Sequence, residues 1–348
     1  MYSKQIKRIM KLSIGFTLLL LLFTTNIGKA QDFHYSQFYN APFTVNPSLT
    51  GIFHGDQRIV GSLRDQWRSV SVPWFNFSLG YDRKFYPRKS KKGFFGAGVS
   101  FNYDTQGDSN LQLSNINLSG SYTRVLNKKN LLGIGAMLGY ASRAFNPNNL
   151  TWDRYWDPAT FTVNSGVGSG ESFDFQRFGF LETSLGINYR WQKTARTKLD
   201  LGIAGYHLTT PTSRFNTGTT DNQSLPIRYS IHGIYSKELS NKLDIQLDAL
   251  YQKQNEYNEL LFGGYLNFYL NQRRGKEFQF RAGLGYRTRK AIFPKIGIEF
   301  NNLFIAGSYD IYIDDFSREH GGGGPELHIR YIIKHVKPLG KFKVCPIY

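Results

Sequence analysis

A short alternation of apolar and other residues recurs along almost the whole chain. Between Phe278 and Arg287 every second residue is apolar, from Phe278 to Tyr286, and the residues between them are glycine, glutamine or arginine. Successive side chains of a strand point to opposite faces, so this pattern predicts a strand with one apolar and one polar face. The pattern recurs at 95–104, 199–207, 243–251, 303–311 and 327–333. We therefore expect one strand unit that is repeated and closed on itself.

The first 30 residues have the pattern of a secretory signal peptide. Basic residues up to Lys11 precede an apolar run over 12–23, and Gly28 and Ala30 supply the small residues that a signal peptidase reads. The run is too short to span a bilayer, and Gln31 rather than a cysteine follows it, so neither a helical anchor nor a lipoprotein is indicated. We expect an exported chain that starts at Gln31.

Composition favours an outer-membrane barrel over a small secreted domain. The chain has 16% aromatic residues and a single cysteine, Cys345, which excludes an internal disulfide framework and is expected to be an inert tail thiol. The formal net charge is +18. Because the chain is exported, an acidic surface or partner is expected rather than nucleic acid. No linker divides the chain, which predicts a segment over 31–56, one barrel over 57–335 and a basic tail over 336–348.

The alternating segments predict about fourteen strands, and an even number is typical of bacterial barrels. They are expected at 58–66, 75–85, 94–104, 111–125, 131–143, 177–191, 199–207, 227–239, 243–251, 257–270, 278–287, 292–300, 303–312 and 326–333. The alternation changes phase near Asn115, which predicts a β-bulge there. The predicted fold class is all-β: a transmembrane, antiparallel, up-and-down β-barrel of the outer-membrane type.

The connections between the predicted strands set the expected orientation. Short turns follow every second strand, whereas the intervening connections include three long ones at 145–173, 208–226 and 313–325. Outer-membrane barrels combine short periplasmic turns with longer outer loops. We therefore expect both termini to face the periplasm.

Basic residues gather in the short turns and define a predicted basic periplasmic face. This face comprises Arg88, Lys89, Lys91, Lys92, Lys128, Lys129, Arg273 and Arg274. Two interpretations stay open. The charges either solvate exposed turns, or they form an electrostatic platform for an acidic periplasmic partner or cell-wall material.

Little in the sequence predicts catalysis, a metal site or a cofactor. The seven histidines lack metal-binding spacings, so we predict no metal site, no cofactor and no enzyme activity. Ser230 and His232 share one strand face, a pair that arises by chance in a serine-rich chain. Asp314, Asp315 and Glu319 lack the pattern of a dedicated calcium loop, so a solvated outer loop is the favoured interpretation.

The polar strand faces are expected to line the lumen. Residues of both charge signs on these faces predict a cross-linked interior: Asn76, Asp82, Asn102, Asp200, Asp244, Asp248, Arg281, Asp310 and Arg330. Glycines on the same faces, such as Gly96, Gly98, Gly283 and Gly285, allow an inserted segment to approach the wall. The segment 31–56 is the candidate for this insertion.

Several short motifs then suggest a family. They are Ser36-Gln37-Phe38-Tyr39-Asn40, Asn46-Pro47-Ser48-Leu49-Thr50-Gly51, Arg64-Asp65-Gln66-Trp67 with Pro73, and the end from Gly323-Gly324-Pro325-Glu326-Leu327 to Tyr331. In these motifs the mature chain resembles the PorP/SprF family, outer-membrane proteins of the type IX secretion and gliding systems. Ser48-Leu49-Thr50 departs from the usual Ala-(aromatic)-Ala.

The resemblance implies a barrel without enzyme activity that helps to secrete or attach particular large surface proteins. The implied partners are the secreted cargo protein, periplasmic or outer-membrane secretion components and the lipid bilayer. Arg64, Trp67 and Arg68 are expected in the first outer loop as a partner-binding site, because Trp and Arg often anchor interfaces. The alternative is an outer-membrane channel for solute uptake, which the inward polar residues equally permit.

Overall fold

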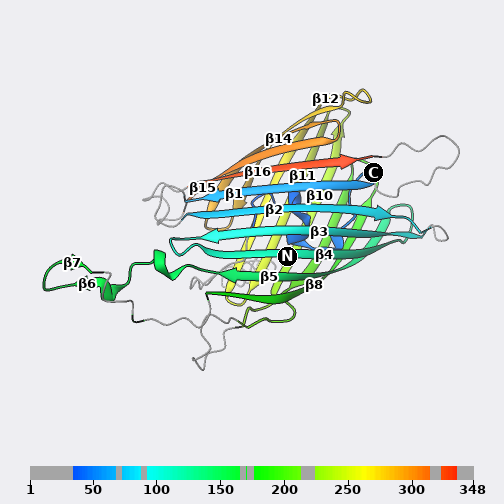
Figure 1. The fold of residues 1–348 in the computed structure, drawn as a ribbon. Helices are drawn as coiled ribbons and strands as arrows, with labels where there is room; N and C mark the ends of the chain where they lie inside the picture. Colours follow the sequence, from blue (N-terminus) through cyan, green and yellow to red (C-terminus); the bar gives the residue numbers. More distant parts are fainter. Residues whose placement is uncertain are drawn as a thin grey trace, which may run out of the picture.

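The structure, a computed structural model, describes residues 34–67, 73–87, 92–164, 170, 176–212, 224–313 and 323–334. Fourteen strands of this described part form a closed antiparallel barrel (Figure 1), which confirms the predicted fold class and strand number. They are β1 Gln57–Gln66, β2 Trp74–Phe85, β3 Gly93–Gln106, β4 Leu111–Val125, β5 Asn130–Ala144, β8 Arg177–Gln192, β9 Lys198–Tyr206, β10 Arg228–Ser240, β11 Leu243–Gln254, β12 Tyr257–Asn271, β13 Phe278–Arg287, β14 Ala291–Phe300, β15 Leu303–Tyr312 and β16 Gly323–Ile333.

The barrel closes between its first and last strands. β16 pairs with β1 from Gln57 opposite Ile333 to Arg64 opposite Glu326. Every other strand pairs with its neighbours along the chain, so the barrel has no open edge at this seam.

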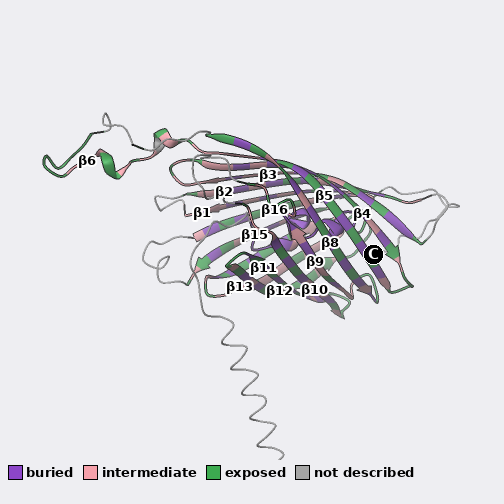
Figure 2. Cartoon of the chain, turned by 90° about the horizontal axis from the view of Figure 1, so that it is seen from below, coloured by how far each residue is buried: buried purple, intermediate pink, exposed green. Residues whose placement is uncertain are grey.

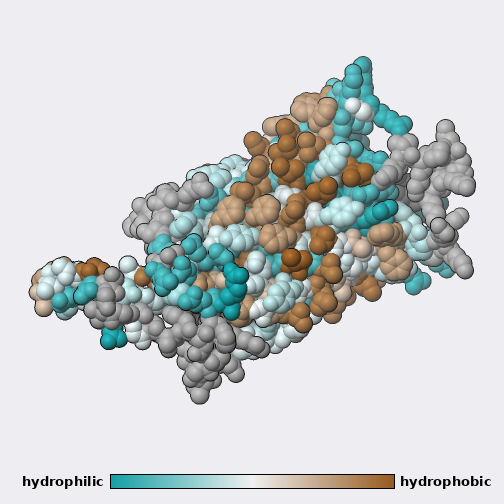
Figure 3. Space-filling view, viewed as in Figure 1, coloured by the Kyte–Doolittle hydropathy of each residue, from teal (hydrophilic) through white to brown (hydrophobic). Residues whose placement is uncertain are grey.

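An apolar belt surrounds the barrel because alternate side chains face outward. In β4 the outward Leu118 is 64% exposed, whereas its neighbours Asn117 and Ser119 are 1% and 6% exposed. Figure 2 shows this alternation as stripes along the strands, and Figure 3 shows apolar side chains gathered in the middle of the barrel with hydrophilic ones towards its ends. This is the surface that a bilayer requires. No helix of the described residues is long and apolar enough to cross a membrane.

The polar strand faces line the lumen, as predicted. Asn76, Asp82, Asn102, Asp200, Asp244, Asp248 and Asp310 are all buried, and Arg281 and Arg330 are half-buried. Ion pairs cross-link the strands inside. Arg190 in β8 pairs with Asp200 in the neighbouring β9 at 2.6 Å, whereas Lys295 in β14 reaches across β13 and β12 to pair with Asp248 in β11 at 3.0 Å. Pairing is required, because an isolated buried charge is costly.

The bulge predicted near Asn115 is wrong. β4 pairs without a register shift with both β3 and β5. The phase of the pattern changes because Leu113 faces the lumen, where it packs with Ala141 and Phe180 in a small apolar cluster. The register shifts in the described strands lie elsewhere, at 238–240 in β10 and 269–271 in β12.

The two ends of the barrel differ. The short-turn end carries the connections 86–92, 126–129, 193–197, 241–242, 272–277 and 301–302. The long-loop end carries 67–73, 107–110, 145–176, 207–227, 255–256, 288–290 and 313–322. The connection 145–176 includes η3 Pro147–Asn149, η4 Asp153–Tyr155 and a small hairpin of β6 Trp156–Asp157 and β7 Thr162–Val163, which projects beyond the barrel (Figure 1).

The apolar belt can be tested by placing a charge in it. Leu138 lies near the middle of β5, is 56% exposed and stands opposite Leu118 of β4. We expect Leu138→Arg to destabilise the folded barrel by about 2–4 kcal/mol in lipid vesicles, because Arg at the bilayer midplane loses its hydration. Urea unfolding measures the change. Leu126→Arg, in a turn, is the control and should change stability by less than about 1 kcal/mol; an equal loss in both variants would contradict the belt.

Candidate functional site in the barrel lumen

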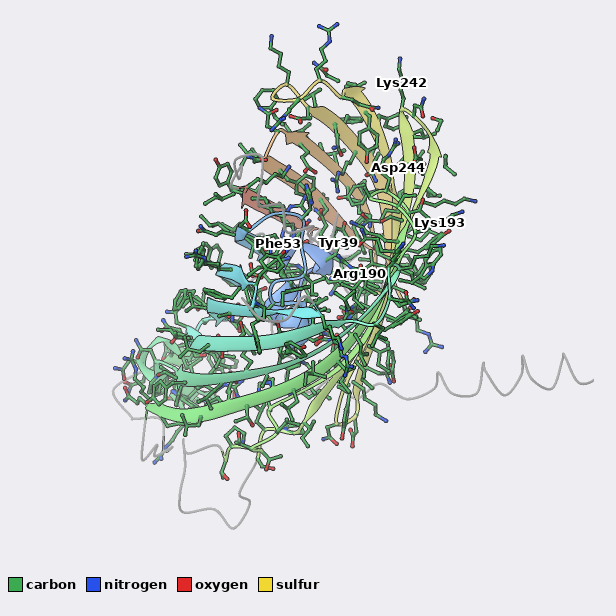
Figure 4. All side chains as sticks on the ribbon, turned by 90° about the vertical axis from the view of Figure 1, so that its right-hand side faces the viewer. Tyr39, Phe53, Arg190, Lys193, Lys242 and Asp244 are labelled. Atoms are coloured by element: carbon green, nitrogen blue, oxygen red, sulfur yellow. The ribbon has the colours of Figure 1, made fainter. Side chains whose placement is uncertain are left out.

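The N-terminal residues 34–56, here called the luminal segment, lie inside the barrel. Figure 4 shows Tyr39 and Phe53 within the ring of strands, and every residue from 34 to 53 except Tyr39 is buried. The segment folds into three short turns of helix: η1 Phe38–Asn40, α2 Pro42–Val45 and η2 Pro47–Leu49. Proline begins α2 and η2, where its fixed φ suits a first helical position and no N–H is lost. The backbone is thereby satisfied within a compact shape that fits the lumen.

Two carboxylates of the last strands hold the start of the luminal segment. The backbone N–H groups of Ser36 and Gln37 each donate to Glu326 at 2.7 Å. The Ser36 hydroxyl donates to Asp310 at 2.7 Å. Hydrogen bonds to buried charged groups are among the stronger ones in proteins, so this is a firm attachment.

Arg64 and Arg287 complete this attachment as a buried charge cluster. Arg64 is fully buried, pairs with Asp310 and donates to the His34 carbonyl at 2.8 Å. Arg287 pairs with Glu259 at 2.8 Å and donates to the Ser36 hydroxyl at 2.8 Å. The cluster therefore joins β1, β12, β13, β15 and β16 through the luminal segment.

The prediction that Arg64 lies in an outer loop is wrong. Arg64 belongs to β1 and points into the lumen, because the strand continues to Gln66 and Arg64 occupies one of its inward positions. A side chain with no exposed surface does not contact an external partner. The motif that contains Arg64 instead contributes to the charge cluster.

Glycines let the middle of the luminal segment lie against the barrel wall. Asn46 caps η2 by accepting from the Ser48 N–H at 2.9 Å, and its amide donates to the Ile187 carbonyl of β8 at 3.0 Å. A Cβ on Gly186 would lie 2.0 Å from the Asn46 Oδ1, and one on Gly135 would lie 2.5 Å from the Ser48 Cα. Any larger residue at these two positions meets the segment.

Gly96 behaves as the sequence predicted, whereas the other three glycines named with it do not. A Cβ on Gly96 would lie 2.5 Å from the Thr50 carbonyl oxygen. At Gly98, Gly283 and Gly285 an added Cβ would meet residues of the barrel itself. Those glycines serve the packing of the wall.

The end of the luminal segment is held at the short-turn side. Asp82 accepts from the Gly51 N–H at 2.7 Å and pairs with Arg58 at 2.8 Å. The Arg58 guanidinium and the Lys84 ammonium lie 4.7 and 4.6 Å from the centre of the Phe53 ring. Gly51 adopts a φ of +76°, which favours glycine at this turn. Cation–π contact and charge-assisted hydrogen bonds thus hold both ends of the segment.

A cavity of about 270 Å³, here called the vestibule, lies between the luminal segment and the short-turn end. Its inner side is formed largely by apolar residues of the segment, among them Phe38, Leu49 and Phe53. Its wall carries Arg58, Arg190, Arg196, Lys198, Arg281, Arg330 and Lys334 with Asp200, Asp244 and Glu299. Figure 4 looks at this end of the barrel, with Tyr39, Phe53, Arg190 and Asp244 around the opening.

Arg196 braces one side of the vestibule from the turn after β8. It pairs with Asp244 at 2.6 Å and with Glu238 at 3.0 Å, and it lies 4.1 Å from the centre of the Tyr269 ring. The hydrogen bond to Asp244 raises the Arg196 pKa above its ordinary value. The turn between β8 and β9 is therefore tied to β10, β11 and β12.

The predicted basic face is present at the short-turn end as far as the structure describes it. Lys92, Lys128, Lys129, Arg273 and Arg274 are exposed there. Arg88, Lys89 and Lys91 lie outside the described residues. The described turns project from the same end as the vestibule.

Trp67 follows β1 at the long-loop end, where it belongs to an aromatic group. Its ring centre lies 6.1 Å from that of Trp74 and 5.9 Å from that of Tyr312. Arg68, predicted beside it, lies outside the described residues. The sequence named Trp67 but gave no signal for this grouping, because Tyr312 comes from the other end of the chain.

The described residues place no group of three potential metal ligands together. Ser230 and His232 both face the lumen and are buried, but His232 bonds to Asn188 at 3.2 Å, and the Ser230 hydroxyl has no hydrogen-bond partner among the described residues. Asp314, Asp315 and Glu319 lie outside the described residues, as does Cys345.

Comparison with known proteins adds two findings. The profile of a family described as Type IX secretion system membrane protein PorP/SprF matches residues 27–331. The toluene transporter TbuX of Ralstonia pickettii has a TM-score of 0.50 and 11% identity over 85% of this chain and 94% of its own. The Pseudomonas putida toluene transporter TodX has a TM-score of 0.48 and 11% identity over 87% and 95%. The likeness to TbuX shows a shared barrel fold and nothing further. No curated protein matches the chain.

The position of the luminal segment is testable at a glycine. We expect Gly135→Val to displace the segment, because the new side chain meets the Ser48 backbone. Gly120→Val, on the neighbouring strand, is the matched control, since a Cβ there meets nothing within 4 Å. In planar bilayers the Gly135 variant should give steady ion conductance, whereas the unaltered barrel and the control should not. A folded, silent Gly135 variant would show that the segment does not block the lumen.

Proposed function

Because the chain belongs to the PorP/SprF family of type IX secretion system membrane proteins, we propose that it is a non-enzymatic outer-membrane barrel that helps to secrete or anchor one large cell-surface protein. It acts through protein–protein contacts. The predicted signal peptide directs export of the chain, and the apolar belt holds the barrel in the outer membrane.

The observation that carries this proposal is the filled lumen. The luminal segment is attached through a buried charge cluster at one end and through Asp82 and Phe53 at the other. Freeing it takes the His34 carbonyl from Arg64 and the Ser36 hydroxyl from Asp310 and Arg287. A buried polar group left without its hydrogen bond costs about 1–3 kcal/mol, and a charged group costs more. A solute channel needs an open path, so the attached segment favours the secretion and attachment function over the uptake alternative.

The family signature supports the same conclusion. Ser36, Gln37, Arg64 and Glu326 all belong to the motifs that suggested the family, and all four meet in the buried cluster. The residues of these motifs therefore hold the luminal segment inside the barrel, and partner contacts are expected at the two ends of the barrel.

The short-turn end faces the periplasm in this proposal, and its basic residues receive an acidic periplasmic component. The long-loop end faces outward and contacts the cargo near Trp67. Arg64 has no part in that contact, because it is buried in the lumen.

Charge reversal tests the periplasmic face. We expect Lys128→Glu, Lys129→Glu and Arg273→Glu together to reduce recovery of a periplasmic partner in pull-downs at least about tenfold at physiological salt. The reversed charges repel an acidic partner that the native charges attract. The control reverses Arg154, Arg177 and Lys253 at the long-loop end and should leave recovery unchanged. If both triple variants bind alike, the turn charges only solvate the barrel.

Removal of one aromatic ring tests the outer contact. We expect Trp67→Ala to abolish surface display of one large protein while the barrel stays in the outer membrane at normal abundance, because buried aromatic anchors dominate interfaces. Surface proteomics of intact cells measures display. Loss of display in Trp156→Ala but not in Trp67→Ala would move the contact to the β6–β7 hairpin, and loss of the barrel itself would make Trp67 a structural residue.

A further inference from the structure

The vestibule has more positive charge than its own carboxylates neutralise. Seven lysines and arginines line it, against three aspartates and glutamates. Three of these basic residues are neutralised by ion pairs: Arg190 pairs with Asp200, and Arg196 pairs with Asp244. Arg58 pairs with Asp82, which does not itself line the vestibule. The remaining basic residues are Lys198, Arg281, Arg330 and Lys334, here called the basic cluster. Glu299 is the lining carboxylate that they do not share with Arg190 or Arg196, and Asp200, which is already paired with Arg190, also attracts Lys198.

Two arginines of the basic cluster share Glu299. Arg281 pairs with Glu299 Oε2, and Arg330 reaches the same oxygen at 3.2 Å. Both guanidinium groups also lie over the Phe304 ring, at 4.6 and 4.5 Å from its centre. The ring and the shared carboxylate hold the two forks in place, a preorganised arrangement that suits a second carboxylate.

The basic cluster is incompletely satisfied within the described chain. The buried Nε–H of Arg281 has no acceptor there. The charges of Lys198 and Lys334 also act on Glu299, whose ion pairs are with Arg281 and Arg330. Four cations therefore act on Glu299, which carries one negative charge. Such a site gains from an added anion.

The other side of the vestibule is apolar. Phe38, Val45, Leu49 and Ile52 of the luminal segment belong to one packed cluster that reaches the cavity, and Tyr39 packs against it. A small inorganic anion contacts only the basic cluster. A peptide with an acidic residue next to an aromatic one contacts both the basic cluster and the apolar residues of the luminal segment, and a cavity of about 270 Å³ accommodates a few side chains.

We propose that the vestibule binds an acidic, aromatic-containing peptide segment of a periplasmic protein, with a carboxylate of that segment on the basic cluster. This inference rests on the proposed function only for the statement that the short-turn end faces the periplasm. The exposed lysines and arginines of the neighbouring turns attract the segment, and the vestibule supplies the specific contact. The chain's own tail is a poorer occupant, because Lys337, Lys341 and Lys343 make it basic.

A binding assay with the purified full-length barrel in detergent tests the inference. The probe is the fluorescein-labelled peptide Gly-Phe-Asp-Glu-Phe-Gly, and the isosteric Gly-Phe-Asn-Gln-Phe-Gly controls for partition into micelles. We expect the acidic peptide to bind at least about tenfold more tightly, and its advantage to shrink as salt rises. Equal binding of the two peptides, or no binding of either, overturns the proposal.

Matched variants locate the site. Lys198→Gln with Lys334→Gln removes two positive charges and breaks none of the ion pairs described above. We expect the affinity for the acidic peptide to fall at least about tenfold. Arg177→Gln with Lys253→Gln removes the same charge at the long-loop end, where both side chains are exposed, and should change affinity less than about twofold. An equal loss in both pairs shows general charge attraction and overturns the proposal. Tighter binding of sodium decanoate than of the peptide also overturns it, because the occupant is then a lipid acid.

Gel mobility before and after heating verifies that each variant is folded. The assay uses no cargo and no cell, so its failure leaves the display experiments for the proposed function unaffected. Conversely, a barrel that binds the peptide in vitro but supports no secretion refutes the proposed function alone.

Discussion

The buried charge cluster around Arg64 is the constraint on which the rest of the structure depends. Arg64 and Arg287 are almost fully removed from water, so each needs a carboxylate and further hydrogen bonds to offset lost hydration. Asp310 and Glu259 supply the charges, and Ser36 supplies a hydroxyl to both Asp310 and Arg287. These residues come from both ends of the barrel sequence and from the luminal segment. Closure of the barrel brings the ion pairs together, and placement of the segment adds the hydrogen bonds of Ser36 and of the His34 carbonyl that complete the cluster.

The luminal segment also explains features of the wall that appear unrelated to it. Gly135 and Gly186 lie on separate strands and share no local reason to be glycine, yet both face the backbone or the capping side chain of η2. An empty lumen would accept larger residues there and gain strand stability, because glycine weakens a strand interior. The wall is thus shaped to the segment, and a tight fit of this kind leaves the ends of the barrel, rather than its lumen, for interaction.

The two ends offer different chemistry. The short-turn end combines exposed lysines and arginines with a vestibule whose arginines Arg281 and Arg330 share one carboxylate. The long-loop end combines the aromatic group of Trp67 with the projecting β6–β7 hairpin. Charge attracts partners over a distance, whereas aromatic rings contribute mainly on contact. The two ends are therefore suited to partners of different chemistry.

Much of the architecture was determined by the sequence alone, because side chains of a strand alternate with a period of two and the bilayer selects the apolar face. The fold class, the strand number and the inward positions of residues such as Asp82 and Asp310 followed from that period. This alternation does not specify which of the inward-facing residues contact one another across the lumen. The pattern therefore predicts a bulge near Asn115, although the phase changes there because Leu113 packs inside. It also predicts a loop position for Arg64, which points into the lumen from β1. The partners of Ser36 lie 274 and 290 residues away along the chain. Only closure of the barrel brings such distant positions together, and so the tertiary structure alone decided the charge cluster, the fit of the luminal segment and the vestibule.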